Sequence, residues 1–174
     1  KDFLANISPT LADPAFFILS LGIGLGGFIA QVHGRSYLQF LAPGLAASTA
    51  MFTAFFETSY GFYVQLTYEN VFKAMLTTPI GVNEIVLGEF IWVAIKGALM
   101  VTVVALVLAA FGLVANPAFL VLSPLIGALV ALPLGAMGLL ASSFVKNINQ
   151  FQVVYSFLIS PIYFFSGIFF PVDQ

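Results

Sequence analysis

The sequence predicts an all-α, polytopic helical membrane protein, and both its composition and its segmentation point to that class. Hydrophobic residues make up 61% of the 174 residues and charged residues only 7%, with a mean hydropathy of +1.09. A soluble domain carries about 25% charged residues, so this chain lacks the polar surface that contact with water requires. The apolar residues also fall into long runs separated by short polar turns, which is the pattern of helices that cross a bilayer.

Five apolar segments are predicted as membrane spans. They cover residues 15–31, 37–65, 86–111, 118–144 and 151–170. The first is close to the minimum of about 17 residues for a helical span. Pro124 and Pro133 are expected to interrupt the fourth, because proline removes a backbone donor and clashes with the preceding turn. The whole chain, residues 1–174, is expected to be one transmembrane domain that is incomplete at both ends.

Basic residues predict the orientation of the spans. With the N-terminus inside, Lys1, Lys73 and Lys146 lie on the cytoplasmic side, and only Arg35 lies outside. The opposite orientation would place most of these charges outside and would violate the positive-inside tendency. We therefore expect a cytoplasmic N-terminus.

No residue pattern predicts catalysis, a metal site or nucleic-acid binding. The sequence has no cysteine, and its one histidine, His33, has no carboxylate cluster near it. No GxxxxGK[ST] motif is present, and the formal GxGxxG that begins at Gly22 lies inside an apolar span without a preceding strand. No run of basic residues indicates nucleic acid. We expect no catalytic residue, metal or cofactor in this chain.

The polar segment 67–85, between the second and third predicted spans, is the most distinctive part of the sequence. Val71, Met75 and Leu76 fall on one face of a short predicted helix, and Lys73 falls away from them. Such a helix indicates either a surface that a soluble partner pushes or a solvated loop between two spans.

Local signals predict where this short helix ends and the next begins. Pro79 and Gly81 are expected to end it, since neither residue favours a continuing helix. Asn83 is then expected to cap a second helix that starts at Glu84.

Three stretches of this chain resemble one family. The stretch KAMLTTPIGVNEIVLGE (73–89) is similar to the cytoplasmic segment between the second and third spans of type-2 ABC exporter permeases. The similarity is closest to the branch that exports nodulation factors, polysaccharides and related amphiphiles. YLQFLAPGLAASTAMFTAFFETSYG (37–61) and SPIYFFSGIFFPVDQ (160–174) resemble the same family in the same order.

The resemblance implies a permease subunit of an ATP-driven exporter, with the sixth span of the family beyond Gln174. It implies an ABC ATP-binding subunit, which would hold ATP and magnesium, and a second permease chain that completes a homodimer. The substrate would be an amphiphile (a lipo-oligosaccharide, a polysaccharide, a lipid or a drug), and the protein would be multi-pass in the bacterial inner membrane. The residues expected to contact the ATPase are Asn70, Val71, Lys73, Ala74, Leu76, Thr77, Thr78 and Pro79.

Aromatic residues crowd the fifth predicted span. They fit an aromatic belt that faces lipid, or a lining of the export path suited to sugar rings or acyl chains. The candidates for the path are Tyr155, Tyr163, Phe164 and Phe169. In the first predicted span, Gly22 and Gly26 have the four-residue spacing of small residues that favours close helix contact.

Two opposite charges are predicted deep inside spans. Glu57 lies about 12 Å from the cytoplasmic end of the second span and Lys96 about 15 Å into the third, at 1.5 Å per residue. These similar depths predict an ion pair between the two spans. The alternative is that Lys96 extends alone towards the cytoplasm while Glu57 is protonated or bonded to hydroxyl groups.

Two other functional classes remain open on the residues alone. A secondary transporter would be expected to show an internal repeat and ion-coupling residues near midplane, and no convincing repeat is present. A membrane scaffold that transports nothing would not need a structured cytoplasmic helix between its second and third spans.

Overall fold

The computed structural model describes residues 36–114 and 116–168, and within these ranges the chain is helical without strands. Three helices are long and apolar enough to cross a membrane, Tyr37–Thr67, Val82–Ala110 and Ala118–Phe144. A shorter apolar helix, Gln150–Phe165, follows them. The first predicted span, with Gly22 and Gly26, and the aromatic residue Phe169 lie outside the described residues.

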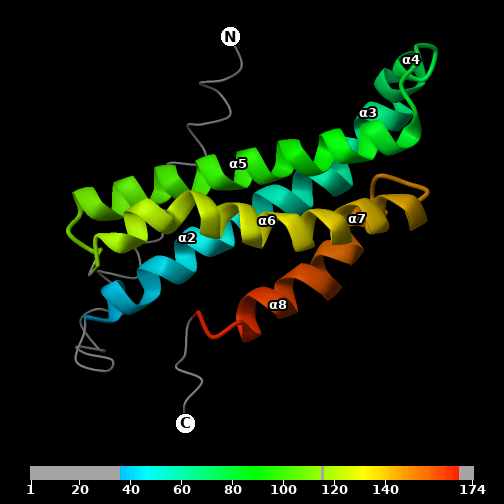
Figure 1. The fold of residues 1–174 in the computed structure, drawn as a ribbon. Coiled ribbons are helices and arrows are strands. Elements are labelled where there is room, and N and C mark those ends of the chain that lie inside the picture. The colour runs from blue at the N-terminus through cyan, green and yellow to red at the C-terminus, as the bar shows by residue number, and fades with distance from the viewer. Residues whose placement is uncertain (1–35, 115, 169–174) are drawn as a thin grey trace.

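The rod Tyr37–Thr67 changes its helical geometry near its C-terminal end. It consists of α2 (Tyr37–Phe56), the π-helix η1 (Glu57–Gly61) and α3 (Phe62–Thr67). The sequence analysis did not predict the π-helix. Beyond this rod, the single-turn helix α4 (Val71–Met75) projects from the end of the bundle (Figure 1).

The prediction that Asn83 caps a helix starting at Glu84 is wrong. Helix α5 (Val82–Ala110) starts earlier, and Gly81 is its N-cap, with an extended backbone at φ −91° and ψ 174°. An N-cap residue must leave the helical region, and Gly81 does so. Asn83 therefore lies inside the first turn of α5.

The prediction that prolines interrupt the fourth span is also wrong, because α6 (Ala118–Phe144) runs through both Pro124 and Pro133. Pro124 cannot donate a hydrogen bond to the carbonyl of Leu120, four residues earlier. The hydroxyl of Ser123 donates to that carbonyl instead, at 2.8 Å. Polar side chains in this role let membrane helices tolerate proline.

The last described rod contains a second π-helix. It consists of α7 (Gln150–Val154), η2 (Tyr155–Ile159) and α8 (Ser160–Phe165). Its helical part stops at Phe165, before the predicted end of the fifth span. Gly167 follows with φ 76°, a left-handed conformation that ends helices.

The core lies where α2, α5 and α6 meet, and one buried cluster takes Ala54, Val93 and Ala131 from these three helices in turn. The face of α6 that lies in the core is made only of small residues: Ser123, Gly127, Ala131, Gly135, Gly138 and Ser142. A Cβ atom on Gly97 of α5 would lie 2.9 Å from the carbonyl oxygen of Gly127, so the two backbones are in contact.

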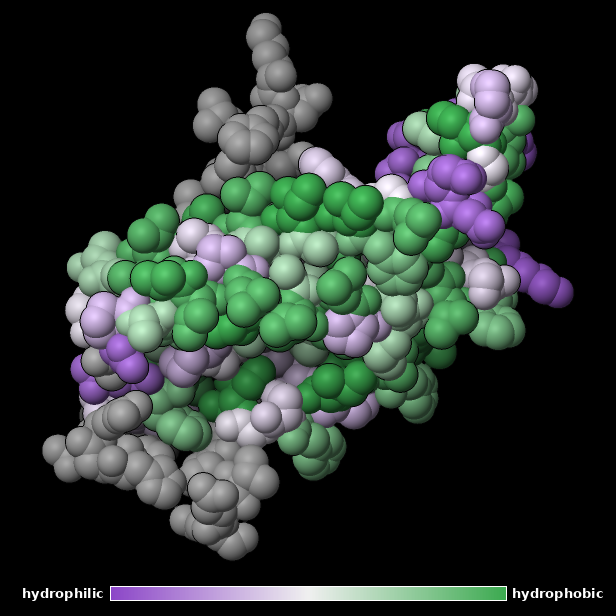
Figure 2. Space-filling model, viewed as in Figure 1, coloured by the Kyte–Doolittle hydropathy of each residue, from purple (hydrophilic) through white to green (hydrophobic). Residues whose placement is uncertain are grey.

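Outside this core the flank of the bundle is apolar. Figure 2 shows hydrophobic residues along the visible flank and hydrophilic residues gathered around the end that carries α4. An apolar flank with polar ends is the surface that a bilayer requires of helices that span it.

Candidate functional site

The end of the bundle that carries α4 is rich in polar residues (Figure 2). This end contains α3, α4 and residues 145–149, which link α6 to α7. The Tyr63 hydroxyl donates to the backbone carbonyl of Lys146 at 3.0 Å and so ties α3 to this link. Lys73 lies on α4, which follows α3, so Lys73 and Lys146 lie at the same end of the bundle.

Helix α4 is held to α3 by one aromatic residue. Asn70 adopts the left-handed conformation, with φ 55°, and turns the chain into the helix. Phe72 is only 4% exposed, and its ring stacks on Phe62 with centroids 4.6 Å apart. The apolar residues of the predicted face point elsewhere, because Met75 and Leu76 are 39% and 46% exposed. Sequence reasoning missed Phe72, although it is the only phenylalanine in the polar segment 67–85.

Two threonines close the C-terminal end of α4. The helix ends at Met75, earlier than Pro79 and Gly81 were expected to end it. Thr77 donates its hydroxyl hydrogen bond to Ala74 O at 2.7 Å, and Thr78 donates to Met75 O at 2.6 Å. The same two carbonyls also accept the backbone N–H groups of Thr77 and Thr78, so each threonine binds the end of the helix through both its backbone and its side chain.

The exposed residues of this segment form what we call the α4 patch. Its members share high exposure and a place on α4 or the turn after it: Lys73, Ala74, Met75, Leu76, Thr77, Thr78 and Pro79. Of the other residues predicted to contact an ATPase, Val71 is half-buried and Asn70 is exposed. The patch carries one positive charge within a mainly apolar and hydroxyl surface, which suits contact with another protein rather than catalysis.

Glu57 and Lys96 lie together in an ion pair. Lys96 Nζ is 2.5 Å from Glu57 Oε2, and the two side chains are 23% and 25% exposed. Trp92 Nε1 donates to the other oxygen, Glu57 Oε1, at 3.2 Å. Lys96 thus does not extend alone, and Glu57 is bound through both oxygens. Sequence reasoning missed the contribution of Trp92, which lies one helical turn before Lys96.

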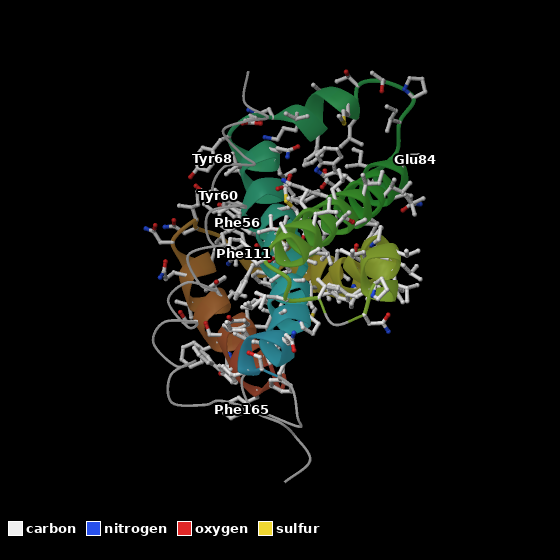
Figure 3. The ribbon with its side chains drawn as sticks, turned by 90° about the vertical axis from the view of Figure 1, so that its left-hand side faces the viewer. Phe56, Tyr60, Tyr68, Glu84, Phe111 and Phe165 are labelled. Carbon is white, nitrogen blue, oxygen red and sulfur yellow. The ribbon has the colours of Figure 1, made fainter. Side chains whose placement is uncertain are left out.

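A groove of about 740 Å³ lies between η1 and the start of the last rod. It is lined by Phe55, Phe56, Ser59, Tyr60, Ile148, Asn149, Phe151, Gln152 and Tyr155. Phe56 and Tyr60 stack with ring centroids 5.0 Å apart, and Figure 3 shows them one after the other along the same rod. Aromatic faces next to hydroxyl and amide groups can bind a ligand that has both apolar and polar parts.

The structure separates the residues predicted to line a substrate path. Tyr155 lines the groove. Tyr163 packs instead beside Met51 and Phe55, with its ring centroid 5.0 Å from that of Phe52. Phe164 lies further along the rod and is 61% exposed. The four candidates therefore do not form one described site.

Among the described residues no group of three histidine, cysteine, aspartate or glutamate side chains could hold a metal ion. The buried polar side chains of this part of the chain all have hydrogen-bond partners.

Comparison with known proteins assigns this chain to a family. The family described as ABC-2 type transporter matches residues 5–174. The chain is 37% identical over 174 residues to Nodulation protein J of Rhizobium leguminosarum bv. trifolii, covering all of this chain and 66% of that protein. It is 34% identical over 174 residues to Nodulation protein J of Rhizobium meliloti, again covering 66% of the relative.

A more distant relative has a name that refers to transport. The chain is 24% identical over 166 residues to the Inner membrane transport permease YadH of Escherichia coli, which covers 95% of this chain and 64% of that protein. The chain spans about two thirds of the length of these relatives. No solved structure matches it. The chain belongs to the ABC-2 type transporter family, as a membrane permease subunit whose similar relatives include the Nodulation protein J group.

Proposed function

We propose that this chain is the permease subunit of an ATP-driven exporter in the bacterial inner membrane, and that α4 is its contact with the ATP-binding subunit. The observation that carries this proposal is the α4 patch. It is exposed and projects beyond the bundle. Along the chain it connects the two rods Tyr37–Thr67 and Val82–Ala110.

The attachment of α4 suits it to receive a push. Phe72 fixes it to α3 on one side, and a short turn joins it to the start of α5 on the other. A displacement of α4 therefore reaches both rods through few flexible residues. Closure of the ATP-binding subunits would move these rods as rigid bodies, a common form of conformational coupling.

Energy conversion is assigned to the partner in this proposal. The ATP-binding subunit would hold ATP and magnesium, and this chain would carry out no covalent chemistry. Two permease copies would form the export path between them. The bilayer would solvate the apolar flank seen in Figure 2.

The groove between η1 and the last rod supports an amphiphilic substrate. Tyr60 and Tyr155 offer ring faces with hydroxyl groups, and Asn149 and Gln152 offer amide groups beside them. Such a lining can stack on a sugar ring or an acyl chain and hydrogen bond to polar substituents. We propose that the groove is the cytoplasmic part of the path for a lipo-oligosaccharide, polysaccharide, lipid or drug.

The coupling role of α4 is tested in proteoliposomes that contain the permease with its co-purified ATP-binding subunit. Lys73→Glu and Ala74→Pro should lower ATP-dependent transport by about tenfold or more, a loss of about 1.4 kcal/mol in coupling, while ATP hydrolysis continues. Ser36→Glu is the matched control, because Ser36 is exposed at the opposite end and its side chain makes no cap bond. Normal transport by both α4 variants in an intact complex would refute the coupling role.

The path is tested separately with a fluorescent lipo-oligosaccharide as the transported probe. Tyr155→Ala should raise its transport KM, because the groove loses an aromatic face. Phe157→Ala is the control, since Phe157 lies on the same π-helix but is 81% exposed and outside the groove lining. Equal effects of the two substitutions would contradict the path assignment and leave the coupling test unaffected.

A further inference from the structure

The ion pair and the π-helix of the second span meet at one residue. Glu57 is the first residue of η1, and both of its carboxylate oxygens contact α5. A π-turn changes the hydrogen-bond register of a helix and is frequently found at functional sites. The geometry of Glu57 is therefore tied to a local distortion of the rod.

Hydroxyl groups inside the rod support this distortion. Thr58 donates to the carbonyl of Ala54 at 2.8 Å, and Ser59 donates to that of Phe55 at 2.5 Å. Ala54, Phe55, Thr58 and Ser59 are each at most 2% exposed, so both hydrogen bonds lie in the buried interior of the bundle. The two side chains hold the wider turn in position.

Helix α6 supports η1 from the other side. A Cβ atom on Gly138 would meet the Thr58 hydroxyl and would lie 2.9 Å from the carbonyl oxygen of Phe55. One on Gly135 would lie 2.9 Å from Val93 of α5. The π-helix is thus packed between the backbone of α6 and the side chains of α5.

We propose that Glu57, Lys96 and Trp92 form a clamp that locks η1 to α5, so that the two rods that flank α4 move as one body. Separating the pair would leave two opposite charges unpaired in apolar surroundings, which is strongly unfavourable. Two donors on one carboxylate also fix its orientation, whereas one donor would leave it free to turn. The clamp goes beyond the coupling role of α4, because its geometry requires no ATP-binding subunit.

The clamp predicts a distinct ranking of variants. Lys96→Met should lower thermal stability most, since it leaves Glu57 as a lone charge. Adding Glu57→Gln to Lys96→Met should recover part of the loss, because neither residue of the pair then carries a charge. The exchanged pair, Glu57→Lys with Lys96→Glu, should recover more than the neutral pair, because it restores the attraction.

A distance measurement tests the mechanical claim directly. These 174 residues contain no cysteine, so no background label attaches within them, and spin labels at Leu66→Cys and Leu87→Cys report on α3 and α5. Both positions are exposed. The full-length permease in lipid nanodiscs, without an ATP-binding subunit, should give one narrow distance distribution. Glu57→Gln or Lys96→Met should broaden it, and the exchanged pair should make it narrow again.

Two further variants separate the clamp from a general loss of polarity. Trp92→Phe keeps the ring packing and removes only the N–H donor, so it should broaden the distribution less than Lys96→Met does. Glu84→Gln removes a carboxylate from the first turn of α5, where the side chain is exposed and outside the clamp, and it should leave the distribution narrow. The proposal is overturned if Glu57→Gln and Lys96→Met leave the distribution narrow, if Glu84→Gln broadens it equally, or if the stability losses of the single substitutions simply add. Because no ATP-binding subunit is present, such a result would leave the proposed function untouched.

Discussion

The contact between α5 and α6 and the short helix α4 are built from opposite kinds of residue. Gly97, Gly127 and Ala131 bring the two long helices so close that their backbones touch. Helix α4 has long exposed side chains and one buried anchor, Phe72. The α5–α6 contact has no space for a larger side chain, whereas α4 exposes most of its surface.

The difference teaches how one small chain can be rigid and responsive at once. In a membrane, helices associate through close packing of small residues rather than through the hydrophobic effect. That packing makes α5 and α6 a stiff pair. A single turn held by one stacked ring opens locally at low free energy, so it can adjust to a partner.

The largest effect is expected at the α5–α6 contact, which has no space for a larger side chain. Gly127→Leu should destabilise the chain by about 3 kcal/mol or more, because the side chain would push into the backbone of Gly97 and Ala98. Thermal unfolding and size-exclusion profiles of the detergent-solubilised protein measure this loss.

Gly88→Leu is the control for that experiment. Gly88 lies on α5, but a Cβ atom there would meet nothing within 4 Å. The variant should fold like the parent. Similar damage from both substitutions would show that glycine flexibility, and not the α5–α6 contact, explains the loss.

A smaller and local effect is expected at the anchor of α4. Phe72→Ala removes the ring that stacks on Phe62, so backbone amides 71–75 should exchange with solvent about tenfold faster, equivalent to about 1.4 kcal/mol. The long helices should keep their protection. Met75→Ala is the control, since Met75 is 39% exposed. Unchanged exchange in the Phe72 variant would mean that another contact holds α4.

The smallest effect is expected at the link between α3 and residues 145–149. Tyr63→Phe removes one hydrogen bond to Lys146 O, worth about 1 kcal/mol, and should lower the thermal midpoint slightly. Tyr68→Phe is the control, because Tyr68 is 60% exposed and the structure gives its hydroxyl no bond among the described residues. A larger fall of the thermal midpoint in the Tyr68 variant would show that the hydrogen bond from Tyr63 does not stabilise this end of the bundle.

The long helices could be predicted because the length of each apolar run, and the polar turns between the runs, can be read directly from the sequence. The segment expected as the fourth span, 118–144, has the bounds of α6. The tolerance of Pro124 was not foreseen, since it depends on one hydroxyl group, that of Ser123, pointing back at Leu120.

The site was partly readable for similar reasons. Similar depths in antiparallel helices placed Glu57 near Lys96, and the structure brings them into contact. The π-helix at Glu57 was not predicted, because a shift of the backbone hydrogen-bond register leaves no pattern in the sequence. The packing role of the small residues of α6 was not predicted either, although Ser123, Gly127 and Ala131 repeat every four residues in the sequence.

The role of α4 as the contact for an ATP-binding subunit is the central claim, and site-specific photocrosslinking tests it most directly. A photoreactive phenylalanine at Leu76 is compared with one at Val121, which is 80% exposed near the start of α6, at the opposite end of the bundle. In the intact complex, the Leu76 probe should crosslink to the ATP-binding subunit and the Val121 probe should not. Crosslinks to that subunit from Val121, or none from Leu76, would contradict the account.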